Sequence, residues 1–269
     1  NARKACAMTD KDTASPQLET ALAAARAAAD ISRKYYRGNL RVTTKEDKTP
    51  VTQADVECEE AIRSIILAAF PDDGFFGEET GSTRADAENL WLVDPIDGTK
   101  AFVRQYPFFS TQIALMRNGR LVLGVSSGPM FDELAWAELG KGAWLNGERL
   151  AVSDIDDPAC AAFSTGNLKS LAGSAGWERL GDFIAQSDRI RGYGDFYHYH
   201  LLAAGKIEAV IQSDVNIQQI AALADILRES GGVCKDMNGN PPSLDTRSVI
   251  AANPSLHSQL LDRLKGFVN

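Results

Sequence analysis

Residues 91–100 read WLVDPIDGTK, and this stretch decides the fold of the chain. Apolar, strand-forming residues lead to two carboxylates, Asp94 and Asp97, which a turn made by Pro95 and Gly98 directs toward one point. Two such carboxylates repel each other unless a cation lies between them. The helix expected after the turn offers backbone N–H groups to an anion such as phosphate. The stretch therefore predicts Mg²⁺ and a phosphate ester, and an ordinary acidic turn that caps a helix is the alternative.

A second carboxylate loop lies upstream, at Gly77-Glu78-Glu79-Thr80. It follows Phe75-Phe76, a short apolar run that predicts a buried strand. Functional side chains tend to lie in loops that a rigid strand positions, so this loop is a candidate part of the same site. Four oxygen donors would then form a shell for one or two divalent cations: Glu78, Asp94, Asp97 and the carbonyl of Ile96.

Three motifs of the chain resemble the inositol monophosphatase superfamily: Gly77-Glu78-Glu79, Asp94 to Thr99, and Gly140 to Gly147 (GKGAWLNG). The resemblance extends from about Leu18 to the C-terminus. It implies an α/β fold, a layered αβαβα sandwich of the inositol monophosphatase / fructose-1,6-bisphosphatase type. Members of the superfamily are Mg²⁺-dependent, lithium-sensitive phosphomonoesterases with two or three metal sites.

The resemblance also implies a role for each residue of the first two motifs. The metal ligands would be Glu78, Asp94, Ile96 through its carbonyl, and Asp97. The catalytic residues would be Glu78, Asp94 and Thr99, with Glu78 and Thr99 positioning the attacking water. The backbone amides of Gly98 and Thr99 would hold the phosphate.

The chain departs from this family at two positions of its C-terminal half. Residues 217–223 read IQQIAAL and match a family signature, roughly P-W-D-x-A-A, whose Asp binds the second metal ion. Gln219 stands at the position of that Asp, and a neutral amide oxygen is a weaker Mg²⁺ ligand than a carboxylate. Gln212 stands where the family usually has a Glu that contacts the hydroxyls or the amine of the substrate. The second metal site is therefore in doubt, and both glutamines are candidate substrate-binding residues.

Three explanations of the two glutamines remain open. The chain is an engineered variant with a weakened site, or a natural divergent member with another substrate or reaction, or a nearby carboxylate replaces the lost one. Asp225 lies on roughly the opposite side of a helix from Gln219, whereas Asp214 precedes that helix and can swing into the site. Thr49 is a further departure, because members that act on inositol carry Asp there and a proton relay through this position is in doubt.

Residues 191–197, RGYGDFY, resemble the histidinol-phosphate phosphatase branch, in which an Asp at the position of Asp195 lines the substrate pocket. The alternative is that Asp195 caps a helix that begins at Phe196, and both roles are compatible. His198 and His200 lie two residues apart on this helix and cannot face one point. We therefore expect them to be structural or surface residues and not zinc ligands.

Composition and charge limit the class of partner. Of the 269 residues 44% are hydrophobic and 24% charged, and the net charge is −8. An acidic chain argues against nucleic-acid or membrane partners, which favour a basic face. The four cysteines form no C-x-x-C pair and predict reduced thiols in a cytoplasmic protein. The expected partners are a small phosphate ester and, by resemblance, a second copy of the chain in a homodimer.

The order of expected elements predicts two subdomains. Residues 1–14 are expected to be a disordered or expression-derived tail, 15–152 an N-terminal α+β subdomain with the metal site, and 153–269 a C-terminal α/β subdomain that completes the substrate pocket. Helices are expected from Pro16 to about Tyr36, before Pro71, and near 168–187, 196–204, 220–230 and 255–267. Strands are expected over 40–44, 109–116, 121–126, 134–138, 143–144, 161–165, 189–192 and 209–212. The helix before Pro71 is expected to turn these residues inward: Val56, Ile62, Ile65, Ile66 and Ala69.

These patterns favour Mg²⁺-dependent hydrolysis of a small phosphate monoester, most like histidinol phosphate or a polyol or inositol phosphate. Gln212 and Gln219 predict that this activity is weakened. One alternative is a divergent member with a different reaction on a phosphorylated or carboxylated small molecule. The other is a binding or regulatory protein that keeps the fold without turnover.

Overall fold

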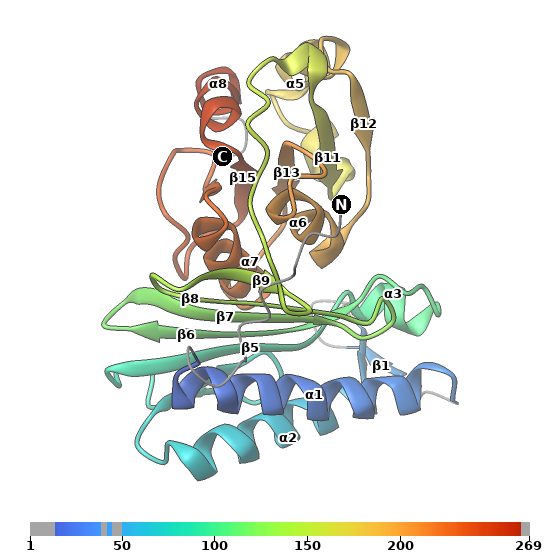
Figure 1. The fold of residues 1–269 in the computed structure, drawn as a ribbon. Helices are drawn as coiled ribbons and strands as arrows, with labels where there is room; N and C mark the ends of the chain where they lie inside the picture. Colours follow the sequence, from blue (N-terminus) through green and yellow to red (C-terminus); the bar gives the residue numbers. More distant parts are fainter. Residues whose placement is uncertain (1–13, 39–41, 45–49, 265–269) are drawn as a thin grey trace, which may run out of the picture.

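The structure, a computed structural model, describes residues 14–38, 42–44 and 50–264. Its elements form layers in the order αβαβα (Figure 1), which confirms the predicted fold class. Helices α1 (Pro16–Tyr36) and α2 (Gln53–Ala69) cover one face of the first sheet. Helices α6 (Asp195–Ala203) and α7 (Ile217–Glu229) lie between the two sheets. The outer layer contains α4 (Leu168–Ala172), α5 (Trp177–Ala185) and α8 (Pro254–Leu264).

The first sheet has eight strands in the order β10-β9-β8-β7-β6-β5-β3-β4. Their bounds are β3 (Gly74–Gly77), β4 (Gly81–Thr83), β5 (Asn89–Asp97), β6 (Ser110–Arg117), β7 (Arg120–Gly128), β8 (Glu133–Glu138), β9 (Gly142–Leu145) and β10 (Glu148–Arg149). All neighbours are antiparallel except β3 and β5, which run parallel and pair Gly77 with Val93. Residues that follow these two strands therefore leave the sheet at the same edge.

The second sheet has five strands in the order β12-β11-β13-β15-β14. Their bounds are β11 (Ala162–Gly166), β12 (Arg189–Arg191), β13 (Ala209–Ser213), β14 (Val233–Lys235) and β15 (Ser248–Ala252). β11 and β13 are parallel and pair Gly166 with Gln212. The remaining elements are the ribbon of β1 (Val42–Thr44) and β2 (Pro50–Thr52), the short helix α3 (Thr99–Val103) and a 3-10 turn at Pro158–Cys160.

Two hairpin turns of the first sheet, Asn118-Gly119 and Asn146-Gly147, follow from their local sequence. Asn118 and Gly119 have φ values of 49° and 76°, and Asn146 and Gly147 have φ values of 51° and 84°. Positive φ at both central residues is the requirement of a tight hairpin turn, which Asn-Gly meets at low cost. The first pair joins β6 to β7 and the second joins β9 to β10.

Three expectations about the helices and strands were wrong. The expected helix over 168–187 is two helices, α4 and α5, separated by a segment that contains Gly173 and Gly176. On α2, Val56 is 38% exposed and Ala69 is also exposed, because the inward face instead includes the polar Asp55 and Glu59. Strands β14 and β15 were not expected. The division into subdomains at residue 152 stays a prediction, and residues 1–13 of the expected tail lie outside the described residues.

Within the described ranges, no helix combines the length and the apolar character that a membrane crossing needs. The cysteines that the structure describes, Cys58, Cys160 and Cys234, are free thiols.

Candidate active site

One cavity of about 670 Å³ is lined by every residue to which the sequence assigns a metal-binding, catalytic, phosphate-binding or substrate-binding role. It is lined from the first sheet and α3 by Glu78, Asp94, Ile96, Asp97, Gly98 and Thr99. From the second half of the chain it is lined by Asp195, Gln212, Asp214 and Gln219. The structure thus brings the two sets together, and the roles assigned to the individual residues stay predictions.

A β-bulge in β5 presents the two central carboxylates. The pairing of β5 with β6 shifts between Asp94 and Asp97, so the strand continues through Pro95. The expectation of a turn at Pro95 was therefore wrong in detail. Pro95 has no N–H to donate, and it lies within the irregular part of the strand, where proline is tolerated. A bulge re-aims side chains, and both carboxylates are buried at this edge of the sheet.

Asp94 is the most unusual group of the cavity. It is 0% exposed, and neither carboxylate oxygen has a hydrogen-bond partner among the described residues. Burial raises the pKa of Asp94 well above its usual range, and the charges of Glu78 and Asp97 add to this effect. Burial also raises the pKa of Asp97, together with the charges of Asp195 and Glu78. A buried carboxylate without a donor is costly, so a bound cation is the partner that Asp94 fits.

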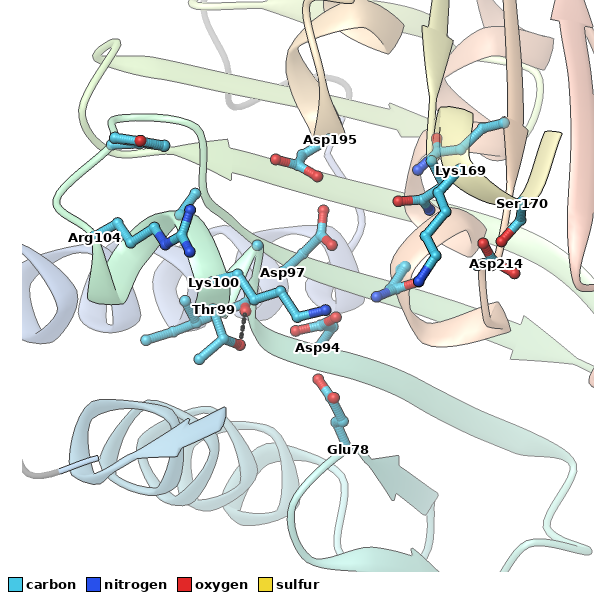
Figure 2. A pocket seen from close by; sticks show the side chains of 17 residues that line it. Glu78, Asp94, Asp97, Thr99, Lys100, Arg104, Lys169, Ser170, Asp195 and Asp214 are labelled. Carbon is cyan, nitrogen blue, oxygen red and sulfur yellow. Dashed lines mark hydrogen bonds between the residues drawn. The ribbon is translucent and has the colours of Figure 1, made fainter. Parts of the chain in front are cut away.

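The carboxylates do not form a closed metal cage by themselves. In the part of the chain that the structure describes, no group of three His, Cys, Asp or Glu side chains is arranged to hold a metal ion. Figure 2 shows Glu78 and Asp94 facing each other, while Asp97 lies farther along the strand toward Asp195. The donor chemistry therefore fits a cation between Glu78 and Asp94, with the more distant Asp97 as a further oxygen donor.

Glu59, a residue that the sequence analysis did not single out, fixes the Glu78 loop. Its buried carboxylate accepts the backbone N–H groups of Glu79 and Thr80 at 2.8 and 2.7 Å. The N–H of Glu78 donates to the carbonyl of Val93 at 3.2 Å, which continues the parallel pairing of β3 with β5. Glu78 is thereby held beside Asp94. A buried acidic residue on an amphipathic helix is the signal that could have revealed this role.

Gly77→Ala should disturb this loop, because a Cβ at Gly77 would collide with the carboxylate of Glu59. We expect a loss of about 1–3 kcal/mol in the free energy of unfolding, the usual cost of overpacking, together with a lower affinity for Mg²⁺. Urea denaturation and a calorimetric Mg²⁺ titration measure the two effects. Gly181→Ala is the matched control, since that glycine lies in α5 with open space around it. Equal stability of both variants would show that Glu59 does not constrain the loop.

Thr99 is held at the start of α3 by two acceptors. Its hydroxyl lies 3.0 Å from the carbonyl oxygen of Ile96 and 3.3 Å from Oδ1 of Asp55. Asp55 is itself fixed by the N–H of Thr52 at 2.7 Å, in a capping box at the start of α2. Because the Thr99 hydroxyl donates its proton to these acceptors, its lone pairs can accept a hydrogen bond from a water in the cavity. Gly98 precedes it with φ 89°, a conformation that favours glycine.

Asp195 lines the cavity and does not cap α6. The N-cap of α6 is Gly194, no side chain caps this end, and Asp195 is the first helical residue with φ 43°. The interpretation of Asp195 as a helix cap was therefore wrong. Burial raises the pKa of Asp195 to about 6.

The histidines and tyrosines of α6 have separate roles in the core. His198 lies 3.1 Å from Ser164 and from Gln212, whereas His200 contacts Glu133 at 2.7 Å and Ser126 at 2.8 Å. The expectation that they do not face one point is confirmed, and both are buried. Tyr197 stacks on Phe131. Tyr199 packs edge-on against the ring of His198, and its hydroxyl donates to Gln212 at 2.8 Å.

The two carboxylates considered as replacements for Gln219 differ in position. Asp214 is exposed and lines the cavity. Asp225 is buried, forms an ion pair with Arg228 and does not line the cavity, which agrees with its ranking as a poor replacement. Thr49 lies outside the described residues.

Three cationic side chains of the cavity were not singled out from the sequence: Lys100, Arg104 and Lys169. Figure 2 shows Lys100 and Lys169 reaching toward the centre of the site from α3 and α4. Lys100 and Lys169 lie on short helices that follow strands, and Arg104 is the C-cap of α3. A basic residue at such a place is too common a feature to indicate a site.

A family model, related sequences and solved structures all match this chain over most of its length. The family model "Inositol monophosphatase family" matches residues 14–266. A histidinol-phosphatase of Mycobacterium tuberculosis is 36% identical over 259 residues, which cover 92% of this chain and 97% of that protein. An inositol-1-monophosphatase of Mesorhizobium japonicum is 33% identical over 248 residues, which cover 90% and 93%. Among solved structures, extragenic suppressor protein suhB of Bartonella henselae matches with a TM-score of 0.86 at 30% identity, covering 94% of this chain and 100% of that one.

Proposed function

The chain belongs to the inositol monophosphatase family, and from this premise we propose that it is a Mg²⁺-dependent phosphatase of a small phosphate monoester. Its relatives include proteins named as histidinol-phosphatases and as inositol-1-monophosphatases, so the proposed substrates are histidinol phosphate and polyol or inositol phosphates. The observation that carries the proposal is Asp94, whose buried oxygens lack a donor at the wall of a cavity that also contains Glu78, Gly98 and Thr99.

In this proposal each residue acts on the ester or on the water that attacks it. Glu78, Asp94, Asp97 and the Ile96 carbonyl would hold Mg²⁺, which when bound supplies positive charge to the phosphoryl oxygens and acidifies a water. The hydroxyl of Thr99, oriented by Asp55 and Ile96, accepts a hydrogen bond from the attacking water, and Glu78 provides a second acceptor. The backbone N–H groups of Gly98 and Thr99 hold the phosphate.

Gln219 is a weak ligand for the predicted second cation. The side-chain carbonyl of Gln219 accepts the backbone N–H of Asn216 at 3.1 Å, so one of the two lone pairs of this neutral oxygen is already engaged. Gln219 therefore does not fit the role of the metal-binding Asp that the family resemblance implies at this position. For this reason we propose a low turnover at ordinary Mg²⁺ concentrations. Cytoplasmic location and a homodimer stay predictions.

Two measurements on the purified chain test the proposed function. Millimolar Mg²⁺ should raise the melting temperature, since a ligand that binds only the folded state stabilises it by mass action. Release of inorganic phosphate from histidinol phosphate and from inositol 1-phosphate should require Mg²⁺. If Mg²⁺ changes neither the melting temperature nor a calorimetric titration, the metal assignment is wrong. Mg²⁺ binding without phosphate release would favour a binding protein or a different reaction.

A further inference from the structure

The wall of the cavity that contains Gln212 presents an amide NH₂ group and not an oxygen. Gln212 is only 9% exposed, and it lies on β13 next to Gly166 of β11, where a larger residue would collide with its side chain. Its Oε1 lies 2.8 Å from the hydroxyl of Tyr199 and 3.1 Å from Nε2 of His198. Its Nε2 has no partner among the described residues and belongs to a side chain that lines the cavity.

Buried hydroxyl groups determine this orientation of the amide. Ser164 accepts the N–H of Tyr193 at 3.2 Å, and its own proton points to Nδ1 of His198 at 3.1 Å. His198 therefore carries its proton on Nε2 and donates it to Gln212. Across the described ranges no other acceptor is found for the hydroxyl of Ser164 or of Tyr199, so a flipped amide would leave both without an acceptor. Burial lowers the pKa of His198 to about 3, which keeps the ring neutral with a single N–H.

Gln219 is oriented in the same way by a simpler contact. Its Oε1 accepts the backbone N–H of Asn216 at 3.1 Å, while its own backbone N–H donates to Asn216 Oδ1 at 3.0 Å. A backbone N–H can only donate, so the amide atom that faces it must be the oxygen. The NH₂ group of Gln219 is then the part of the side chain that can donate hydrogen bonds into the cavity. Both glutamines thus offer donors where a cation would need lone pairs.

The neighbouring turn adds further donors. Lys169 and Ser170 follow β11 and line the same cavity, and Asn167 anchors their helix by donating to the carbonyl of Ser213 at 2.6 Å. Asp214 is the one acidic side chain that this wall contributes to the cavity, and Figure 2 places it beside Ser170. Asp195 lies elsewhere, on the side of Asp97.

We propose that the wall formed by Gln212, Gln219, Lys169 and Ser170 binds an oxyanion that the substrate carries in addition to its phosphate ester, such as a carboxylate or a second phosphate. The proposal rests on the proposed function, because it narrows the small phosphate monoesters of the same site to those with a second anionic group. Histidinol phosphate, which carries an ammonium group, is then expected to be a poorer substrate than these esters. Amide NH₂ groups, a hydroxyl and an ammonium group can all donate to a negatively charged oxygen, and such charge-assisted hydrogen bonds are the strong ones. At these four side chains an ammonium group of a substrate would instead meet other hydrogen-bond donors.

Matched esters test this class of substrate. Phosphoglycolate, 2-hydroxyethyl phosphate and phosphoethanolamine differ only in the end group, which is a carboxylate, a hydroxyl or an ammonium group. Their four-carbon homologues test how far the wall lies from the phosphate ester, and 1,4-butanediol bisphosphate tests a second phosphate. We expect kcat/KM to be at least about tenfold higher for the carboxylate than for the ammonium ester. Binding is measured separately by calorimetry with 3-phosphonopropionate and 3-aminopropylphosphonate, which cannot be hydrolysed, and the carboxylate should again bind more tightly.

Variants connect the preference to the wall. Gln212→Glu keeps the acceptor for Tyr199 and His198 and should reverse the preference, so that the ammonium ligand binds more tightly than the carboxylate. Lys169→Met should reduce the preference for the carboxylate. Lys206→Met, outside the cavity, is the control. If no ester releases phosphate, the proposed function fails while the phosphonate affinities still decide the inference. If phosphate is released but the ammonium ligands bind as well as or better than the carboxylates, or Gln212→Glu leaves the ratio unchanged, the inference is overturned and the phosphatase stands.

Discussion

Asp94→Asn should abolish Mg²⁺-dependent phosphate release and, with it, the stabilisation of the protein by Mg²⁺. A metal ion contributes several kcal/mol to a phosphoryl transition state, so we expect a loss of about a hundredfold to ten-thousandfold in kcat/KM. The side chain is buried and has no hydrogen-bond donor among the described residues, so this residue has the largest predicted effect on binding of the cation.

The same variant should be more stable than the wild type in the absence of divalent cations. Burial raises the pKa of Asp94 above its value in the unfolded chain, so the folded protein holds this proton more tightly. Stability of the wild type should therefore fall as the pH rises from about 4 toward the raised pKa, and remain reduced above it. Asn carries no charge, so the melting temperature of the variant should fall less over this range.

Melting curves at pH 5 and pH 8, with EDTA and with Mg²⁺, measure both effects. Asp72→Asn is the control, because Asp72 is exposed and does not line the cavity. A variant that retained phosphate release, or that still gained stability from Mg²⁺, would show that the cation binds elsewhere.

The double change Gln212→Glu with Gln219→Asp should raise phosphate release from a neutral polyol phosphate by at least about tenfold, which is about 1.4 kcal/mol of barrier. It adds two carboxylates to the wall and provides oxygen ligands for a second cation. Two-metal chemistry needs positive charge at both the attacking and the leaving oxygen. The Mg²⁺ stoichiometry in a calorimetric titration should rise from one to two.

Gln186→Glu is the matched control, because Gln186 is an exposed residue at the end of α5. Rapid turnover of the unmodified chain would indicate that another group, such as Asp214, already serves a second cation. An unchanged rate of the double variant would favour a fold that has turned to another reaction or to binding alone.

The sequence predicted that the residues of the first half of the candidate site lie together, because local patterns determine their positions. Asp94 and Asp97 lie in one continuous motif, and Glu78 follows a strand that pairs in parallel with β5. Parallel pairing places the ends of both strands at one edge, so two motifs separated along the chain meet without help from the rest of the fold. The hairpin turns at Asn118-Gly119 and Asn146-Gly147 are equally local, since their backbone conformation depends on two residues.

The second half of the site depends on contacts that no local pattern contains. The orientation of Gln212 is set by Tyr199 and His198 from a helix of the layer between the sheets. The wrong inward face of α2 has a related cause: hydrophobicity alone favoured Val56, whereas the true face carries Asp55 and Glu59, which serve as acceptors for neighbouring loops. A pattern based only on hydrophobicity cannot predict polar residues that face inward and bind other polar groups.

The network behind Gln212 has an evolutionary consequence. Tyr199 and His198 donate hydrogen bonds to the side-chain oxygen at position 212. A glutamate at this position would offer such an oxygen as readily as the glutamine does. The codons of these two amino acids differ by a single base, so one mutation can reverse the polarity of the wall while the surrounding core stays packed. A lineage that carries this network can exchange one class of substrate for another without passing through a misfolded intermediate.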